Sequence, residues 1–257
     1  MSKVEYGLQM FSLRDIARDD LEAALRGTAR LGYKYVELTR ITENPAEKVK
    51  GWLDELGLIC CATHTGLALL TPETIDETTK IHKILNCDYL VIPNAPFGEG
   101  KEEAERIIEA MNFAQKKLAE NGIGMAYHNH SREFFPTPFG MVFEDEVINR
   151  TSLDLELDTF WSFNSGVDTL AFLEKYKSRI KIVHLRDGIP SAPECKSFER
   201  CQEGVVGKSL GEGLAPVKEV REWAIKNNVR MVIESGGCNP TGLEESERCI
   251  KYLRSLE

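Results

Sequence analysis

The stretch Tyr35–His64, YVELTRITENPAEKVKGWLDELGLICCATH, contains one strand–helix–strand repeat. Its two ends, YVEL and LICCATH, are apolar runs of strand length. Between them, PAEKVKGWLDELGL has the pattern of an amphipathic helix, and Gly57 stands where a left-handed residue can close that helix. The stretch therefore predicts two parallel strands that are joined by a right-handed helical crossover.

The same alternation runs through the whole chain. Apolar runs of strand length occupy residues 4–10, 35–38, 58–64, 88–93, 123–128, 152–158, 180–185 and 230–234. Most of them are too continuously apolar for a sheet with one face in water. Eight such strand–helix units in 257 residues predict an α/β protein, a closed (β/α)8 TIM barrel that forms a single domain over residues 1–257. A doubly wound open sheet is the alternative, but LQMFSLRD after the first strand lacks the glycines of a phosphate-binding turn.

Composition narrows the classes of partner. The chain is 42% hydrophobic, which provides for a large core, and its net charge of −9 disfavours nucleic acid and anionic membranes. No segment approaches the roughly 20 apolar residues of a membrane span, and MSKVEYGLQMF has no apolar core of a signal peptide. Seven cysteines without zinc-type pairs indicate free thiols. We therefore expect a cytoplasmic protein with a small-molecule partner, and a homo-oligomer is compatible with this size of barrel.

Ligating side chains gather at the predicted strand ends, where TIM barrels carry their active sites. Five strands end on such residues, namely His64, His128, Asp158, His184 and Glu234. His130 lies just beyond His128, the fourth strand ends at Pro93–Asn94, and the first leads to Phe11. His82 falls within a predicted helix and is interpreted as a surface residue. Ligating residues at one rim predict a functional site there.

Asp158, His184 and Glu234 follow the last three strands, which are neighbours in a barrel, so they can converge on one ion. One imidazole with several carboxylate oxygens suits Mn²⁺ first, with Co²⁺, Mg²⁺, Fe²⁺ or Zn²⁺ as alternatives. For the fourth ligand, from the fifth strand, we favour Glu133 at the end of MAYHNHSREF (Met125–Phe134). Alternatively, this stretch supplies only hydrogen bonds around the site.

Several segments together resemble the sugar phosphate isomerase/epimerase family, whose members are barrels similar to xylose isomerase. These segments are YHNHSREF, LELDTFWSFNSGVD, VHLRDG, LGEG and VIESGG, in this order. The resemblance implies one divalent metal held by Glu, Asp, His and Glu, which places Asp158, His184 and Glu234 in the ligand set. Relatives with a glutamate directly at the end of strand five have no HNH, so either Glu133 or His128 is the first ligand here. Many relatives carry lysine at the position of Arg186.

The expected chemistry is removal of a proton from carbon next to a carbonyl, with the resulting enediolate stabilised by the metal. Glu133 and Glu234 are the predicted proton-transfer pair of this isomerase or epimerase. His64, His128, His130 and Arg186 would orient the hydroxyls or polarise the carbonyl, and Phe11, Asn94 and Trp161 would contact the sugar.

Two alternatives remain open. A lyase or dehydratase acting on a keto-sugar, inosose or keto-glycoside would use the same enediolate. A non-catalytic sugar-binding subunit is the more remote alternative. In addition, the segment Asp187–Gly213 exceeds an ordinary loop and is a candidate lid, whose glycine amides either contact a substrate oxygen or act as hinges.

Overall fold

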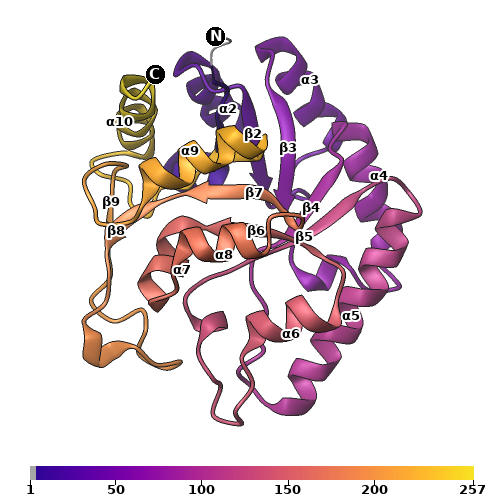
Figure 1. Ribbon diagram of the computed structural model, residues 1–257. Coiled ribbons are helices and arrows are strands. Elements are labelled where there is room, and N and C mark those ends of the chain that lie inside the picture. The colour runs from indigo at the N-terminus through magenta and orange to yellow at the C-terminus, as the bar shows by residue number, and fades with distance from the viewer. Residues whose placement is uncertain (1–3) are drawn as a thin grey trace.

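The structure is a computed structural model that describes residues 4–257. Eight parallel strands close into a barrel in the order β1-β10-β7-β6-β5-β4-β3-β2 (Figure 1). The strands are β1 Gly7–Gln9, β2 Tyr35–Thr39, β3 Ile59–His64, β4 Tyr89–Ile92, β5 Gly124–His128, β6 Asp154–Asp158, β7 Ile180–Leu185 and β10 Arg230–Ile233. The predicted (β/α)8 TIM barrel is confirmed.

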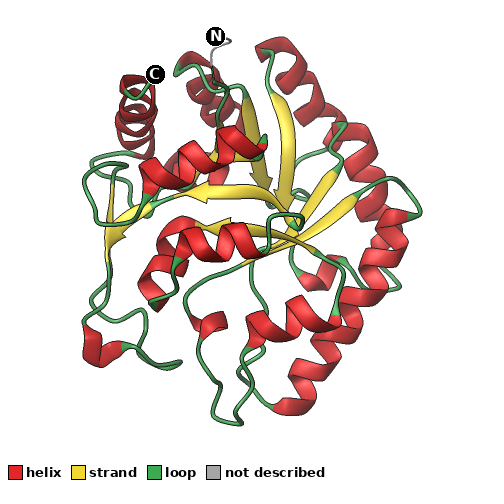
Figure 2. Cartoon of the chain, viewed as in Figure 1, coloured by secondary structure: helices red, strands yellow, loops and turns green. Residues whose placement is uncertain are grey.

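Helices surround the barrel on the outside (Figure 2). They are α1 Arg14–Ala17, α2 Leu21–Arg30, α3 Ala46–Leu56, α4 Ile75–Leu85, α5 Lys101–Ala119, α6 Phe143–Arg150, α7 Thr159–Ser165, α8 Thr169–Lys175, α9 Val217–Asn227 and α10 Gly242–Ser255. As expected, Gly57 ends α3 in the left-handed region, at φ 65°. Among residues 4–257, no helix combines the length and the apolar character that crossing a bilayer requires.

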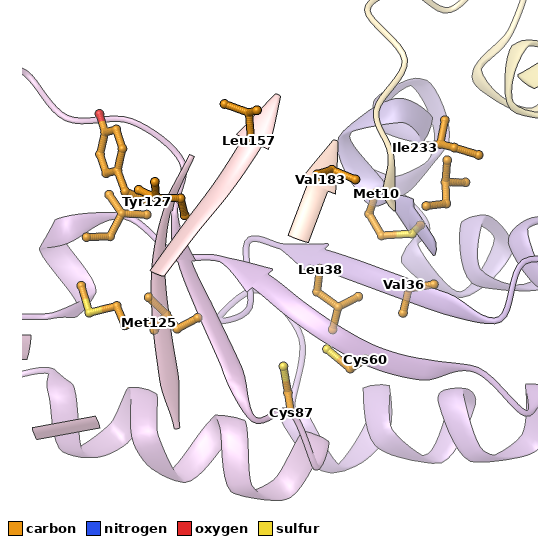
Figure 3. Close-up of a cluster of buried hydrophobic side chains, with 14 of the residues drawn as sticks. Met10, Val36, Leu38, Cys60, Cys87, Met125, Tyr127, Leu157, Val183 and Ile233 are labelled. Carbon is orange, nitrogen blue, oxygen red and sulfur yellow. The ribbon is translucent and has the colours of Figure 1, made fainter. Parts of the chain in front are cut away.

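Two apolar layers lie on opposite faces of the strands. The larger packs between strands and helices and includes Met10, Leu38, Tyr127 and Ile233 (Figure 3). The smaller is a separate cluster in the barrel interior, made of Cys61, Ala62, Val91, Ala126, Ile182 and Val232. Side chains two positions apart along a strand share a face. The interior layer therefore aims the next inward positions, His64, His128, His184 and Glu234, into the mouth of the barrel.

The prediction that His82 lies on the surface is wrong, because this residue is fully buried. Its Nδ1 lies 2.8 Å from the carbonyl oxygen of Thr78, and its Nε2 lies 2.8 Å from Thr63 Oγ1. A carbonyl only accepts, so Nδ1 carries the proton and Nε2 accepts from the Thr63 hydroxyl. Burial lowers the pKa of His82. This neutral imidazole points from α4 toward β3, and both of its nitrogens are hydrogen-bonded.

The long segment after β7 is organised by one carboxylate. Strands β8 Asp187–Ile189 and β9 Val206–Lys208 form an antiparallel pair. The Asp187 carboxylate accepts N–H groups from Gly188, Gly211, Gly213 and Ala215, at 2.8 to 3.0 Å. A Cβ on Gly213 would collide with this carboxylate. The amides of Gly211 and Gly213 thus bind the protein's own aspartate, an arrangement that neither the substrate-contact nor the hinge interpretation anticipated.

Replacing Asp187 with Ala is expected to lower the free energy of unfolding by about 2–4 kcal/mol, because four backbone donors lose a charged acceptor. Chemical denaturation followed by circular dichroism measures this change. Glu212→Ala in the same loop is the matched control, since Glu212 is exposed, and it should change stability by less than about 0.5 kcal/mol. Equal effects of the two substitutions would contradict the role of Asp187.

Candidate metal centre at the C-terminal end of the barrel

Four buried side chains meet at the C-terminal ends of adjacent strands. We call His128, Asp158, His184 and Glu234 the rim group; each offers one ligand atom, and these atoms all lie within 4.8 Å of one another. His184 Nδ1 is 3.0 Å and His128 Nε2 4.0 Å from Glu234 Oε2. The structure therefore brings together Asp158, His184 and Glu234, as the sequence suggested, and it supplies His128 from strand five.

The rim group fits a divalent cation. Asp158 Oδ1 accepts the N–H of Trp161 and so caps α7, while Asp158 Oδ2 is buried without a hydrogen-bond partner. Burial raises the pKa of Asp158 to about 7. An unpaired buried carboxylate oxygen is costly, and a bound cation removes that cost. Burial also lowers the pKa of His128 to about 4, so this imidazole is neutral at neutral pH and can offer a lone pair.

Arg186 forms an ion pair with Glu234. Burial opposes ionisation of Glu234, but the Arg186 guanidinium, 3.3 Å away, and His184 hold the pKa of Glu234 well below its usual range. Arg186 also lies over the ring of Trp161, 4.7 Å from its centroid. The face of Trp161 on that side is thus occupied by a cation, while its buried Nε1 has no hydrogen-bond partner. Trp161 therefore offers an unpaired donor for the sugar contact that was predicted for it from the sequence.

Glu133 does not join the rim group. It lies in the short 3-10 helix Arg132–Phe134, where its two oxygens accept from the Tyr127 hydroxyl at 3.1 Å and the backbone N–H of His130 at 3.0 Å. Burial raises the pKa of Glu133 to about 7. Glu133 is only 2% exposed, and its carboxylate is occupied by these two donors. Glu133 is thus hydrogen-bonded to the HNH turn. Of the two ligand candidates from this stretch, His128 is the one that lies in the rim group.

Glu144 on α6 supplies a pH-dependent test of this buried region. Burial raises its pKa from 4.5 to about 8, so the folded protein holds a proton that the unfolded chain releases above pH 4.5. The free energy of unfolding therefore falls between about pH 4.5 and pH 8. Glu144→Gln, which is always neutral, should gain about 2–4 kcal/mol relative to wild type on going from pH 5 to pH 8.

Urea denaturation of ion-free protein at both pH values measures this gain. Glu146→Gln on the same helix is the control, because Glu146 is only partly buried and pairs with Arg150. A stability difference between Glu144→Gln and wild type that is the same at pH 5 and pH 8 would contradict the raised pKa.

Of the other predicted site residues, His64 lies inside the barrel and the rest lie farther out. His64 Nε2 lies 2.8 Å from Glu156 Oε2. His130 lies at the mouth, its ring centroid 4.9 Å from that of His128 and 5.6 Å from that of Trp161. Phe11 is 48% exposed, with the Arg14 guanidinium 4.6 Å from its ring centroid, and Asn94 is exposed in the loop after β4. Within the described residues, no hydrogen bond joins Phe11 or Asn94 to the rim group.

Two carboxylates that were not predicted as site residues, Glu37 on β2 and Glu156 on β6, are fully buried in the barrel interior. Burial disfavours the charged imidazole of His184, but Glu156 and Glu37 outweigh it and hold the pKa of His184 well above its ordinary value. A signal existed in the sequence. Glu156 lies two positions before Asp158, so both share one strand face, and Glu37 is the only charged residue of YVEL.

A large cavity lies elsewhere. It has a volume of about 1290 Å³ at the N-terminal ends of the strands, and its lining includes Tyr35, Tyr89, Lys181 and Arg230. Neither group of metal-ligating side chains in residues 4–257 belongs to it. Because the active sites of TIM-barrel enzymes lie at the C-terminal ends of the strands, the rim group is the candidate functional site.

A parallel eight-stranded barrel with ligating side chains at the C-terminal strand ends is the architecture of TIM-barrel enzymes. The chain belongs to the xylose isomerase-like TIM barrel family, whose profile matches residues 25–255.

Individual relatives carry different activities. Over 87 residues, which are 34% of this chain and 29% of the relative, the sequence is 31% identical to inosose dehydratase 2 of Bacillus cereus. A sugar phosphate isomerase/epimerase from Parabacteroides distasonis has a TM-score of 0.79 at 23% identity, covering 99% of this chain and 95% of that one. The probable 3-DHS dehydratase AsbF of Bacillus anthracis has a TM-score of 0.72 at 13% identity, covering 97% and 99%. The two structural matches show the shared fold.

Proposed function

We propose that this protein is a divalent-metal-dependent sugar isomerase or epimerase that removes a proton from carbon next to a carbonyl. The observation that carries this proposal is the rim group, in which Asp158 Oδ2 is buried without a partner beside His128, His184 and Glu234. Family membership and the sugar isomerase/epimerase fold relative support the same class of substrate.

The rim group would hold the ion through two imidazoles and two carboxylates. When bound, a divalent ion supplies Lewis-acid stabilisation of negative charge that develops on substrate oxygens. The second imidazole, from His128, favours Mn²⁺, Fe²⁺, Co²⁺ or Zn²⁺ over Mg²⁺, which prefers oxygen ligands. Mn²⁺ remains the first choice, as in the sequence analysis.

The chain's own residues supply proton transfer and orientation. Glu234 is held ionised by Arg186 and His184, so it can accept a proton at the barrel mouth. His130 is partly exposed, and burial holds its pKa well below the ordinary value, so it is a neutral second acceptor. It takes the role that the sequence analysis gave to Glu133. Asn129 Nδ2 and Trp161 Nε1, both buried without partners, would donate to substrate oxygens.

Elimination is the second candidate function. After removal of the same proton, the hydroxyl on the neighbouring carbon can take a proton and leave as water while a carbon–carbon double bond forms. The match to inosose dehydratase 2 favours this alternative specifically. That match covers 29% of the relative's length. The two outcomes differ in the product, because a dehydratase forms a product lighter by one water and an isomerase or epimerase does not.

Metal content and substrate turnover test the proposed function together. We expect purified protein to bind one equivalent of Mn²⁺ by elemental analysis, to melt at a higher temperature with Mn²⁺, and to convert at least one compound in a panel of keto-sugars, inososes and keto-glycosides. Protein that binds no metal and shows no thermal shift, yet binds a panel sugar unchanged, would indicate a non-catalytic sugar-binding subunit.

A further inference from the structure

Beneath the rim group lies a second cluster that shares two of its histidines. His64, His128, Glu156 and His184 place their ligand atoms within 4.8 Å of one another. Three imidazole nitrogens surround one oxygen, Glu156 Oε2, at 2.8 Å from His64, 3.1 Å from His128 and 3.2 Å from His184. Glu37 Oε2 lies 2.6 Å from His184 Nε2. All these atoms lie in the closed interior of the barrel.

The two shared histidines turn opposite nitrogens to the two clusters. His128 directs Nδ1 at Glu156 and Nε2 toward Glu234. His184 directs Nε2 at Glu37 and Glu156, and Nδ1 at Glu234. A neutral imidazole has one N–H and one lone pair, and a carboxylate only accepts hydrogen bonds. His184 Nδ1 also lies 3.0 Å from Glu234 Oε2, so carboxylates face both nitrogens of this ring. A bound cation displaces the proton from the nitrogen that faces Asp158 and Glu234. The interior carboxylates would then keep the remaining proton on the inner nitrogen.

We infer that Glu37 and Glu156 are positioning residues that fix the tautomer and the ring orientation of His128 and His184. This inference rests on the proposed metal site. It adds an explanation of how the protein orients two imidazoles, with their lone pairs toward the metal. Hydrogen bonding of the distal nitrogen to a carboxylate also makes an imidazole a stronger metal donor. Glu156 acts on both histidines through one oxygen, while Glu37 acts on His184 alone.

A second cation in the interior is the competing explanation. Glu37 Oε1 and Glu156 Oε1 are buried without hydrogen-bond partners, and His64 Nε2 lies 3.5 Å from Glu37 Oε1. An ion there would need the inner nitrogens of His128 and His184 as ligands, so both rings would have to bridge two cations and lose their protons. The distances of 2.6 to 3.2 Å from these nitrogens to carboxylate oxygens are those of hydrogen bonds.

The test measures zinc affinity in the full-length protein by competition with a chromogenic chelator. Loss of an outer hydrogen-bond partner costs about 10- to 100-fold in metal affinity, so we expect about 100-fold for Glu156→Gln. For Glu37→Gln we expect about 10-fold, because Glu37 contacts only His184 of the two shared histidines. The control is Glu144→Gln, a buried glutamate on α6 outside both clusters, which should bind zinc as wild type does.

A second readout does not depend on activity or on the fold of one variant. Nitrogen-15 NMR of zinc-loaded wild type should show the proton on Nδ1 of His128 and on Nε2 of His184. In Glu37→Gln this assignment should weaken at His184 alone, which keeps the inference testable if Glu156→Gln does not fold.

Three results would overturn the inference: the opposite tautomers, wild-type zinc affinity in folded Glu156→Gln, or a second equivalent of zinc that survives Asp158→Ala. These results leave the proposed function intact. Wild-type protein that binds no zinc, Mn²⁺ or Co²⁺ would overturn the proposed metal site together with the inference.

Discussion

Glu234→Gln is expected to lower the rate of solvent-deuterium exchange into substrate by about 10²- to 10⁴-fold, the usual contribution of a proton-transfer group. Glu234 directly follows β10 and is the rim carboxylate that Arg186 and His184 hold ionised. Glutamine keeps the size and one ligating oxygen but cannot accept the proton. The rate should be measured by NMR in D2O at saturating Mn²⁺, so that weaker metal binding does not account for the loss.

Glu144→Gln is the matched control for this measurement, because it makes the same chemical change at a buried carboxyl outside the rim group. It should leave the exchange rate within about threefold of wild type, since threefold corresponds to only about half of the 1.4 kcal/mol of a tenfold step. Undiminished exchange in metal-loaded Glu234→Gln would remove Glu234 from the proton-transfer role.

Asp158→Ala is expected to weaken metal binding by more than about 100-fold, which exceeds the loss of an outer hydrogen-bond partner. The substitution removes the buried oxygen, Asp158 Oδ2, that has no hydrogen-bond partner among residues 4–257. Elemental analysis after gel filtration should find metal in wild type and none in the variant, and turnover should disappear with the metal.

Asp168→Ala separates ligation from helix capping. Both aspartates cap a helix, since Asp158 accepts from Trp161 N at 2.8 Å and Asp168 accepts from Ala171 N at 3.0 Å. Loss of either cap should cost about 1 kcal/mol. Only Asp158→Ala should lose the metal, and equal metal content in the two variants would mean that Asp158 is a cap alone.

The barrel could be predicted from the sequence because each strand is a continuous apolar run followed by an amphipathic pattern. Asp158, His184 and Glu234 were predicted because apolar runs end on them, and the period of two places the side chains at these strand ends on the interior face. The same rule brings His64 and His128 inward, two positions after Ala62 and Ala126.

Two features escaped the sequence because they depend on packing. Glu133 follows β5 closely in the sequence, which suggested a position at the barrel mouth. In the structure the chain after β5 forms a 3-10 turn, and the Glu133 carboxylate accepts a hydrogen bond from the Tyr127 hydroxyl. Glu37 and Glu156 are charged residues within strands, and an isolated buried charge is costly. Only the arrangement in space shows the three imidazoles around Glu156 that stabilise it.

The position of deuterium in the product tests the central claim most directly. The first keto-sugar, inosose or keto-glycoside that the protein converts should be turned over in D2O with Mn²⁺, and again after removal of the metal by a chelator. We predict that, only when metal is present, an isomerised or epimerised product carries deuterium on the carbon next to its carbonyl, and a dehydrated product has lost the original hydrogen from that carbon. Conversion that keeps the original hydrogen on this carbon, or that runs at full rate without metal, would contradict metal-dependent proton abstraction.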